Sequence, residues 1–188
     1  MCCNLKPATL AARLVVMNVL ETERLLVTRF TTADAAFILA LLNSPGWLQY
    51  IGDRGIRTVE EAEKYIQKVP LLSYHAHNFG LYRVSLKEDE KPVGTCGLLK
   101  RDTLPDADIG FAFLPEFCGH GFAFEAASAI VQFEQKKHQL KRLLAITLAE
   151  NTASRKLLEK LGMKYERDVQ LTPEDDVLML YAVDSQPS

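Results

Sequence analysis

A short glycine-rich stretch, PEFCGHGFAFEA at positions 115–126, constrains the fold of this chain more than any other feature. Its two glycines, Gly119 and Gly121, follow a strand-like segment and stand directly before a run with apolar residues at helical spacing. A strand, a glycine-rich loop and a helix in series leave unpaired amides at the helix N-terminus, and glycine lets an anion approach them closely. The pattern predicts an anion-binding loop, and a pyrophosphate is the expected guest.

Two common nucleotide-binding motifs do not fit this stretch. Phe124 stands where the third glycine of G-x-G-x-x-G would be, and there is no Lys-Ser/Thr pair of a P-loop. The glycines also suit a simple turn, because glycine adopts positive φ at no steric cost. On the two glycines alone, both interpretations stand.

Composition limits the classes of protein to consider. The 188 residues are 48% hydrophobic, enough for one domain with a substantial core. The formal net charge of −2 comes without a long basic run, which argues against nucleic acid or an acidic membrane as a partner. No apolar run approaches the roughly 20 residues of a membrane span. The four cysteines lack metal-ligand spacing, so we expect no metal and a cytoplasmic protein with reduced thiols.

The start of the chain is interpreted separately from the rest. We read residues 1–19 as an N-terminal extension, either a loose arm or a misassigned start, and residues 20–188 as the domain. The apolar stretch 14–19 is shorter than most signal-peptide cores, and no small-residue cleavage site follows it. No repeat or linker divides the remainder.

Hydrophobic periodicity and turn residues predict the order of secondary structure. The expected strands are 23–30, 79–87, 93–100, 108–114, 142–148, 165–169 and 177–183. Two helices are expected after the first strand: one with an N-cap at Thr32, and one that begins at a capping box of Thr58 with Glu61 and stops at Pro70. A third helix follows the glycine-rich loop, and a fourth spans 151–161 and ends at Gly162.

Four segments of the chain resemble the GNAT superfamily of acetyl-CoA-dependent N-acetyltransferases, and specifically its RimJ/RimL-like branch. They are ETERLLVTRF, DIGFAFLPEFCGHGFAFEA, ENTASRKLLEKLGM and LMLYAVD, and the resemblance covers roughly residues 20–183. It implies a mixed α/β fold in which helices flank a mostly antiparallel sheet with a V-shaped splay. It also implies an acyltransferase that moves the acetyl group of acetyl-CoA to a primary amine by direct attack, without a covalent enzyme intermediate.

The resemblance assigns residues to the coenzyme. It implies that amides of the glycine-rich loop bind the coenzyme A pyrophosphate, at Cys118, Gly119, His120, Gly121, Phe122 and Ala123. It implies that the strand before the loop pairs with the pantetheine amides through the backbone of Phe111, Ala112 and Phe113. Asn151 and Ser154, at the start of the fourth helix, are implied to face the pantetheine end.

Three positions of the loop depart from the family pattern. Glu116 stands where the family usually has Gln or Arg, Cys118 where this branch often has Trp, and His120 where it often has Lys or Arg. The loop therefore carries less fixed positive charge than is usual, while its backbone amides are retained.

Acetyl transfer to an amine needs a neutral amine and a proton for the departing thiolate. Asp108 occupies a position where many family members carry the carboxylate that deprotonates the amine. It is alternatively a solvated carboxylate at a strand end, and Asp106 and Glu116 compete for the role of base. Ser154 is the candidate that protonates the thiolate, unless it only caps its helix, and Tyr181 is the alternative acid.

Trp47, the only tryptophan, lies in a turn-rich segment where the family places an acceptor-binding lid. We assign it to substrate binding, with a place in the core as the alternative. The expected acceptor is a small-molecule amine or a protein N-terminus, and the expected assembly is a monomer or a homodimer. A protein of another class, a non-catalytic acyl-CoA sensor or scaffold with the same fold, is the alternative function.

Overall fold

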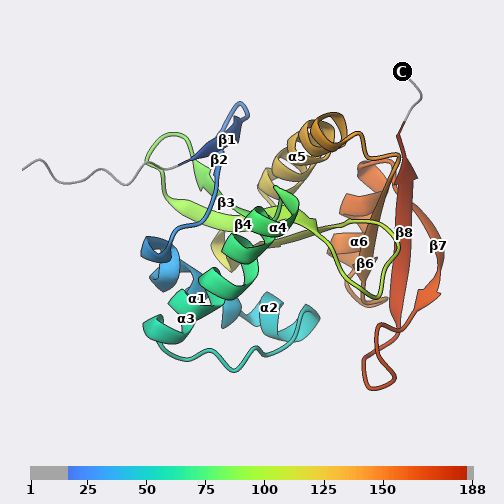
Figure 1. The fold of residues 1–188 in the computed structure, drawn as a ribbon, viewed down its shortest axis with the longest axis horizontal. Helices are drawn as coiled ribbons and strands as arrows, with labels where there is room; N and C mark the ends of the chain where they lie inside the picture. Colours follow the sequence, from blue (N-terminus) through green and yellow to red (C-terminus); the bar gives the residue numbers. More distant parts are fainter. Residues whose placement is uncertain (1–16, 186–188) are drawn as a thin grey trace, which may run out of the picture.

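Eight strands form one sheet with helices on both faces in the computed structural model, which describes residues 17–185 (Figure 1). The sheet order is β1-β2-β3-β4-β5-β6-β8-β7, and all neighbouring strands are antiparallel except β5 and β6. The strands are β1 (Asn18–Glu21), β2 (Leu25–Thr28), β3 (Leu81–Leu86), β4 (Pro92–Leu99), β5 (Asp108–Phe113), β6 (Arg142–Thr147), β7 (Lys164–Val169) and β8 (Leu178–Asp184). The predicted mixed α/β fold with a mostly antiparallel sheet is confirmed.

Four α-helices lie between β2 and β3, where the sequence predicted two. The α-helices are α1 (Ala35–Leu42), α2 (Pro45–Tyr50), α3 (Val59–Ile66), α4 (Leu72–His77), α5 (Phe122–His138) and α6 (Thr152–Lys160). α2 occupies what looked like a turn, because a proline at the first helical position starts a helix as readily as it makes a turn. The predicted N-cap at Thr32 is wrong, because a short 3-10 turn, Thr32–Asp34, precedes the helix: Thr31 caps that turn, and Asp34 is the N-cap of α1.

The helix that begins at Thr58 does not stop at Pro70, contrary to the prediction. α3 passes into a π-helical segment, Gln67–Leu71, and the chain continues as α4. A π turn changes the spacing of the backbone hydrogen bonds, which accommodates a residue that lacks an N–H. The capping box at the start is confirmed, because the Glu61 amide donates to the Thr58 hydroxyl oxygen at 3.2 Å.

Two helical layers cover opposite faces of the sheet. α5 packs Ala127 and Ile130 against one face, together with Phe111 of β5. Ala112, the next residue of β5, contacts the cluster formed by α1, α2 and α3 on the other face. Side chains of a strand alternate between faces, so β5 lies in the middle of the molecule with a helical layer on each side.

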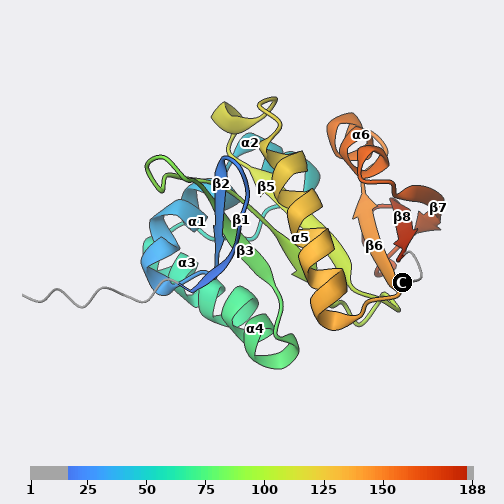
Figure 2. The ribbon, with the colours of Figure 1, turned by 90° about the horizontal axis from the view of Figure 1, so that it is seen from above.

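β5 and β6 meet at one position and then separate. Asp108 pairs with Leu144, and no other β5–β6 pair occurs in the part of the sheet that the structure describes. On its other side, every residue of β5 pairs with β4. One edge of β5 therefore faces an opening after Asp108, as the V-shaped splay requires. Figure 2 shows β6, β8 and β7 set to one side of α5.

The sheet begins at Asn18, because β1 pairs with β2. Two residues of the expected extension 1–19 thus belong to the sheet, and residues 1–16 lie outside the described part of the chain. Within residues 17–185, none of the helices has the length and apolar content needed to cross a membrane.

Gly97 supplies a stability test, because β4 approaches the end of β3 very closely at this residue. A Cβ at Gly97 would lie 2.0 Å from the backbone oxygen of Gly80. We expect Gly97→Ala to lower the free energy of unfolding by about 1–3 kcal/mol or more, because backbone must move. Gly46→Ala is the control, since a Cβ there meets nothing within 4 Å. Equal urea midpoints for the two variants would contradict this packing.

Candidate functional site

The glycine-rich loop connects the open end of β5 to the start of α5. A 3-10 turn, Pro115–Phe117, leads from the strand, and the chain then passes through two left-handed residues, Gly119 with φ of 81° and Gly121 with φ of 83°. Residues that have a Cβ rarely adopt this backbone conformation. Both glycines are therefore required by the backbone path that brings α5 to the opening.

Six consecutive amides, those of residues 119–124, have no acceptor among the described residues. The first hydrogen bond of α5 runs from the Glu125 amide to the Gly121 carbonyl oxygen at 3.1 Å. The Cys118 amide is already used, because it donates to the Pro115 carbonyl oxygen at 3.2 Å. The row of free amides therefore begins at Gly119 and includes Phe124, and coenzyme binding by the Cys118 amide stays a prediction that this hydrogen bond does not favour.

An ion pair fixes the start of α5 to the turn between β1 and β2. The Arg24 guanidinium contacts the Glu125 carboxylate at 2.7 Å, and the Arg24 amide and Thr22 hydroxyl donate to the same carboxylate at 2.9 and 2.6 Å. Partial burial acts to raise the pKa of Glu125, but these hydrogen bonds lower it below its usual value. Arg24 also donates to the His120 carbonyl oxygen at 3.2 Å and so contacts the loop directly.

The side chains of the loop carry no fixed positive charge of their own, and the Arg24 guanidinium lies over the Phe122 ring, 4.6 Å from its centroid. His120 stacks on Phe122, with ring centroids 5.8 Å apart, and its Nδ1 lies 3.0 Å from the Cys118 carbonyl oxygen. Cys118 is exposed, and partial burial of its thiol together with the nearby Glu116 raises its pKa. Glu116 is itself exposed on the turn before the loop.

Asp108 is buried at the point where β5 leaves β6, and only 1% of it is exposed. Both of its carboxylate oxygens lie 3.1 Å from the Nε of Arg101. Burial raises the pKa of the Asp108 carboxyl, and the Arg101 cation opposes that rise. The interpretation of Asp108 as a solvated carboxylate is therefore wrong. Of its competitors, Asp106 is half-buried and Glu116 is exposed.

The structure shows which residue caps the start of α6, a role that the sequence left open between Asn151 and Ser154. Asn151 is the N-cap, and its side-chain oxygen accepts a hydrogen bond from the Ser154 amide at 3.0 Å. The Ser154 hydroxyl has no hydrogen-bond partner within the described part of the chain and is half-buried. Ser154 is therefore not the cap of its helix, and that alternative is wrong.

Tyr181 lies on β8 beneath α6, and only 1% of the residue is exposed. Its hydroxyl accepts a hydrogen bond from the Nε of Arg155 at 3.4 Å. The ring of Tyr165 meets it edge-on, with centroids 6.0 Å apart. Arg155 follows Ser154 directly, so α6 brings both candidate acids to the same end of the molecule.

Trp47 does not lie in an exposed loop, contrary to the expectation. It is part of α2, is 5% exposed and packs in the core cluster of α1 and α3. Its indole nitrogen is buried without a hydrogen-bond partner among the described residues. A direct contact with a substrate stays a prediction that this burial does not favour.

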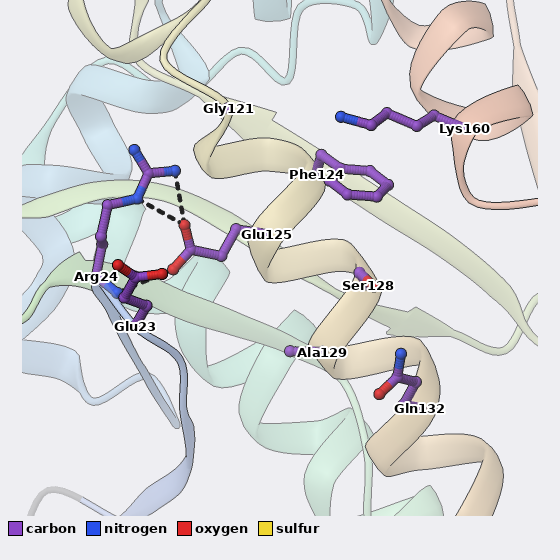
Figure 3. Close-up of a pocket in the computed structure, with 9 residues that line it drawn as sticks. All are labelled: Glu23, Arg24, Gly121, Phe124, Glu125, Ser128, Ala129, Gln132 and Lys160. Carbon is purple, nitrogen blue, oxygen red and sulfur yellow. Dashed lines mark hydrogen bonds and ion pairs between the residues drawn. The ribbon is translucent and has the colours of Figure 1, made fainter.

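Three cations near these groups were not assigned a functional role from the sequence: Arg24 at the loop, Arg101 at Asp108, and Lys160, whose ammonium lies 4.0 Å from the centre of the Phe124 ring (Figure 3). Each contacts its partner through the tertiary fold, either from a distant part of the sequence or from a loop. No local sequence pattern predicts such a contact. No cluster of three or more His, Cys, Asp or Glu side chains that could hold a metal ion occurs in residues 17–185.

Comparisons with known proteins bear on the whole site. A family model described as an acetyltransferase (GNAT) domain matches residues 24–164. YoaA of Bacillus subtilis, named as an uncharacterized N-acetyltransferase, is 30% identical over 150 residues, which are 79% of this chain and 84% of that protein.

Solved structures share the fold. A GNAT-family acetyltransferase from Bacillus anthracis aligns with a TM-score of 0.72 at 25% identity, over 87% of this chain and 96% of that one. RimL, a ribosomal alpha-N-protein acetyltransferase solved in complex with coenzyme A, aligns with a TM-score of 0.74 at 16% identity, over 87% and 95%. The protein belongs to the GNAT family and is an acetyl-CoA-dependent acetyltransferase.

Proposed function

We propose that this protein transfers the acetyl group of acetyl-CoA to a primary amine by direct attack within the opening between β5 and β6. The observation that carries this proposal is the row of six free amides, which follows β5 after one 3-10 turn. An unpartnered row of amides at a helix start is suited to a pyrophosphate. The unpaired edge of β5, from Phe111 to Phe113, is suited to the amides of a pantetheine chain in the same way.

Two groups supply the proton transfers in this proposal, the buried Asp108 and the half-buried Ser154. Asp108 accepts a proton from the attacking ammonium, either directly or through a water molecule, so that the amine attacks in its neutral form. The Ser154 hydroxyl donates a proton to the departing thiolate, near the positive end of the α6 dipole. Tyr181, held by Arg155, is the alternative donor.

The acceptor is an amine of a small molecule or of a protein N-terminus. RimL, which has the same fold, is named as an alpha-N-protein acetyltransferase, and this name supports a protein N-terminus as one candidate acceptor. The functional assembly is a monomer or a homodimer.

Thiol release tests the function. We expect the protein to release coenzyme A thiol from acetyl-CoA in the presence of at least one acceptor from a panel of N-terminal peptides, polyamines and drug-like amines. Mass spectrometry then identifies the acetylated product. Coenzyme binding without thiol release for any acceptor would instead indicate the non-catalytic sensor.

Gly121→Val tests the amide row. A branched Cβ resists the φ of 83° and would crowd the Arg24 guanidinium, whose nearest nitrogen lies 3.5 Å from an ideal Cβ. We expect acetyl-CoA affinity, measured by calorimetry, to fall at least tenfold, about 1.4 kcal/mol, while the fold is kept. Gly55→Val, at another positive φ of 68° on an exposed loop, is the control and should bind normally. Unchanged affinity in a folded Gly121→Val protein would disprove the pyrophosphate assignment.

Asp108→Asn tests the base. Turnover should fall at neutral pH, and the loss should shrink as pH rises, because more of the amine is then already neutral. Arg101→Gln removes the cation that opposes the raised pKa of Asp108, so the acidic limb of its pH–rate profile should move to higher pH. Asp106→Asn is the control and should leave the profile unchanged. Equal turnover of the wild type and Asp108→Asn at every pH would remove Asp108 from the mechanism.

Ser154→Ala and Asn151→Ala separate catalysis from capping. Asn151→Ala should cost roughly 1 kcal/mol of stability, because the cap is lost. Ser154→Ala should leave the free energy of unfolding nearly unchanged and lower kcat on the order of a hundredfold, as expected for a lost general acid. If Ser154→Ala keeps normal kcat, Ser154 is not the donor, and Tyr181→Phe becomes the decisive variant.

A further inference from the structure

The loop between β4 and β5, residues 100–107, carries a cation that uses only part of its hydrogen-bonding capacity. Arg101 contacts Asp108 through its Nε, which lies 3.1 Å from both carboxylate oxygens. Neither Nη nitrogen of Arg101 donates a hydrogen bond to any of residues 17–185, and the side chain is 32% exposed. No ion pair joins Arg101 to the other carboxylates of this loop, Asp102 and Asp106. The outer edge of the guanidinium is therefore available to a ligand.

Two contacts hold the loop in place around this guanidinium. The Lys100 ammonium donates to the carbonyl oxygens of Leu104 and Pro105 at 3.3 and 2.7 Å, which closes the loop on itself. The Leu144 amide of β6 donates to the Ala107 carbonyl oxygen at 3.0 Å and fixes the end of the loop. Arg101 lies between these anchors and is held beside the Asp108 carboxylate.

Asp108 points to the face of the sheet that α5 does not cover. Phe111 packs with α5, and Ala112 packs on the other face, so the alternation along β5 places Asp108 on the face of Ala112. An apolar cluster lies on this face at the same height, because it contains Leu144, the residue that pairs with Asp108. Its other members are the buried Leu104, Leu180 and Ala182 and the partly buried Ile146, Val169 and Leu171. A molecule that approaches Asp108 on this face meets a cation and an apolar surface.

We propose that the acceptor is an amino acid with an apolar side chain and that the Nη groups of Arg101 bind its carboxylate. The proposal rests on the proposed function and names its acceptor. Only 1% of Asp108 is exposed, so the guanidinium is the charge that an approaching ammonium meets first. A carboxylate on the same molecule replaces this repulsion by attraction, because the planar fork of Arg binds a carboxylate through two parallel hydrogen bonds.

An α-amino acid suits this arrangement because one carbon carries its amine, its carboxylate and its side chain. The amine lies at Asp108, the carboxylate at Arg101 and the side chain on the apolar cluster. The transfer itself is unchanged: the amine nitrogen forms a bond to the acetyl carbon, the carbon–sulfur bond breaks, the amine loses a proton to Asp108, and the thiolate gains one from Ser154. A peptide N-terminus lacks the carboxylate at this position, and a polyamine adds a second positive charge.

Three acceptors with one carbon skeleton test the proposal: leucine, leucinamide and isopentylamine. They carry a carboxylate, a neutral amide and no substituent at the same position. We expect kcat/KM for leucine, measured by thiol release from acetyl-CoA, to exceed the other two values about tenfold or more, as hydrogen bonds to a charged group predict. The amine of leucinamide is less basic than that of leucine, so more of it is neutral at pH 7, and a preference for leucine cannot come from the amine itself. Phenylalanine, phenylalaninamide and 2-phenylethylamine repeat the comparison with a larger side chain.

Arg101→Gln should abolish the preference for the carboxylate. Its effect on the Asp108 base is common to all three acceptors and therefore cancels in the ratio of their kcat/KM values. Arg101→Lys keeps a cation beside Asp108 but not the planar fork, so most of the preference should be lost there too. Lys136→Gln removes an exposed cation from the last turn of α5, on the other face of the sheet, and should keep the ratios of the wild type.

Three results would overturn this assignment while leaving acetyl transfer intact. The first is equal kcat/KM of the wild type for all three acceptors in both sets. The second is an unchanged ratio in the Arg101 variants, and the third is a higher kcat/KM for a peptide N-terminus or a polyamine than for either amino acid. Absence of thiol release with every amine would overturn the proposed function itself and this inference with it.

Discussion

The separation of β5 from β6 after a single residue pair is the constraint on which the rest of the structure depends. Parallel neighbours cannot be joined by a tight turn, so the chain must return along α5 before it enters β6. α5 therefore starts at the same end of β5 where the two strands lie apart. One topological requirement brings the free edge of β5, the glycine-rich loop and the first amides of α5 to one opening.

The contacts at the start of α5 fix its position more than they stabilise the fold. The Arg24 side chain is 47% exposed, and an ion pair of this exposure typically contributes less than about 1 kcal/mol. The carboxylate of Glu125, however, also accepts hydrogen bonds from the Arg24 amide and the Thr22 hydroxyl. Three donors from one turn hold the helix start in one orientation, and the amides of the loop are oriented with it.

The parts of the site that local sequence determines were predicted, and the parts that depend on tertiary contacts were not. The loop, α5 and the helix at Asn151 follow from glycine, capping and periodicity, which act within a few residues. The sequence did not reveal that Arg101 pairs with Asp108, because that contact depends on how the loop after β4 folds back over the strand end. It also misjudged Pro70 and left the burial of Trp47 open, since whether a proline ends a helix or a tryptophan is buried is decided by the packing around it.

The departures in the loop have a physical consequence once the surrounding cations are placed. Glu116, Cys118 and His120 leave the loop itself without a fixed positive charge. The amides at the start of α5 still carry a partial positive charge, because they are aligned with the helix dipole. Two cations beside the start of α5 come from other elements: Arg24, which Glu125 pairs, from the turn between β1 and β2, and Lys160 from α6. The proposed anion site thus combines fixed backbone dipoles with cations on exposed side chains. Salt screens exposed charges most effectively, so the side-chain contribution should weaken with ionic strength while much of the amide contribution remains.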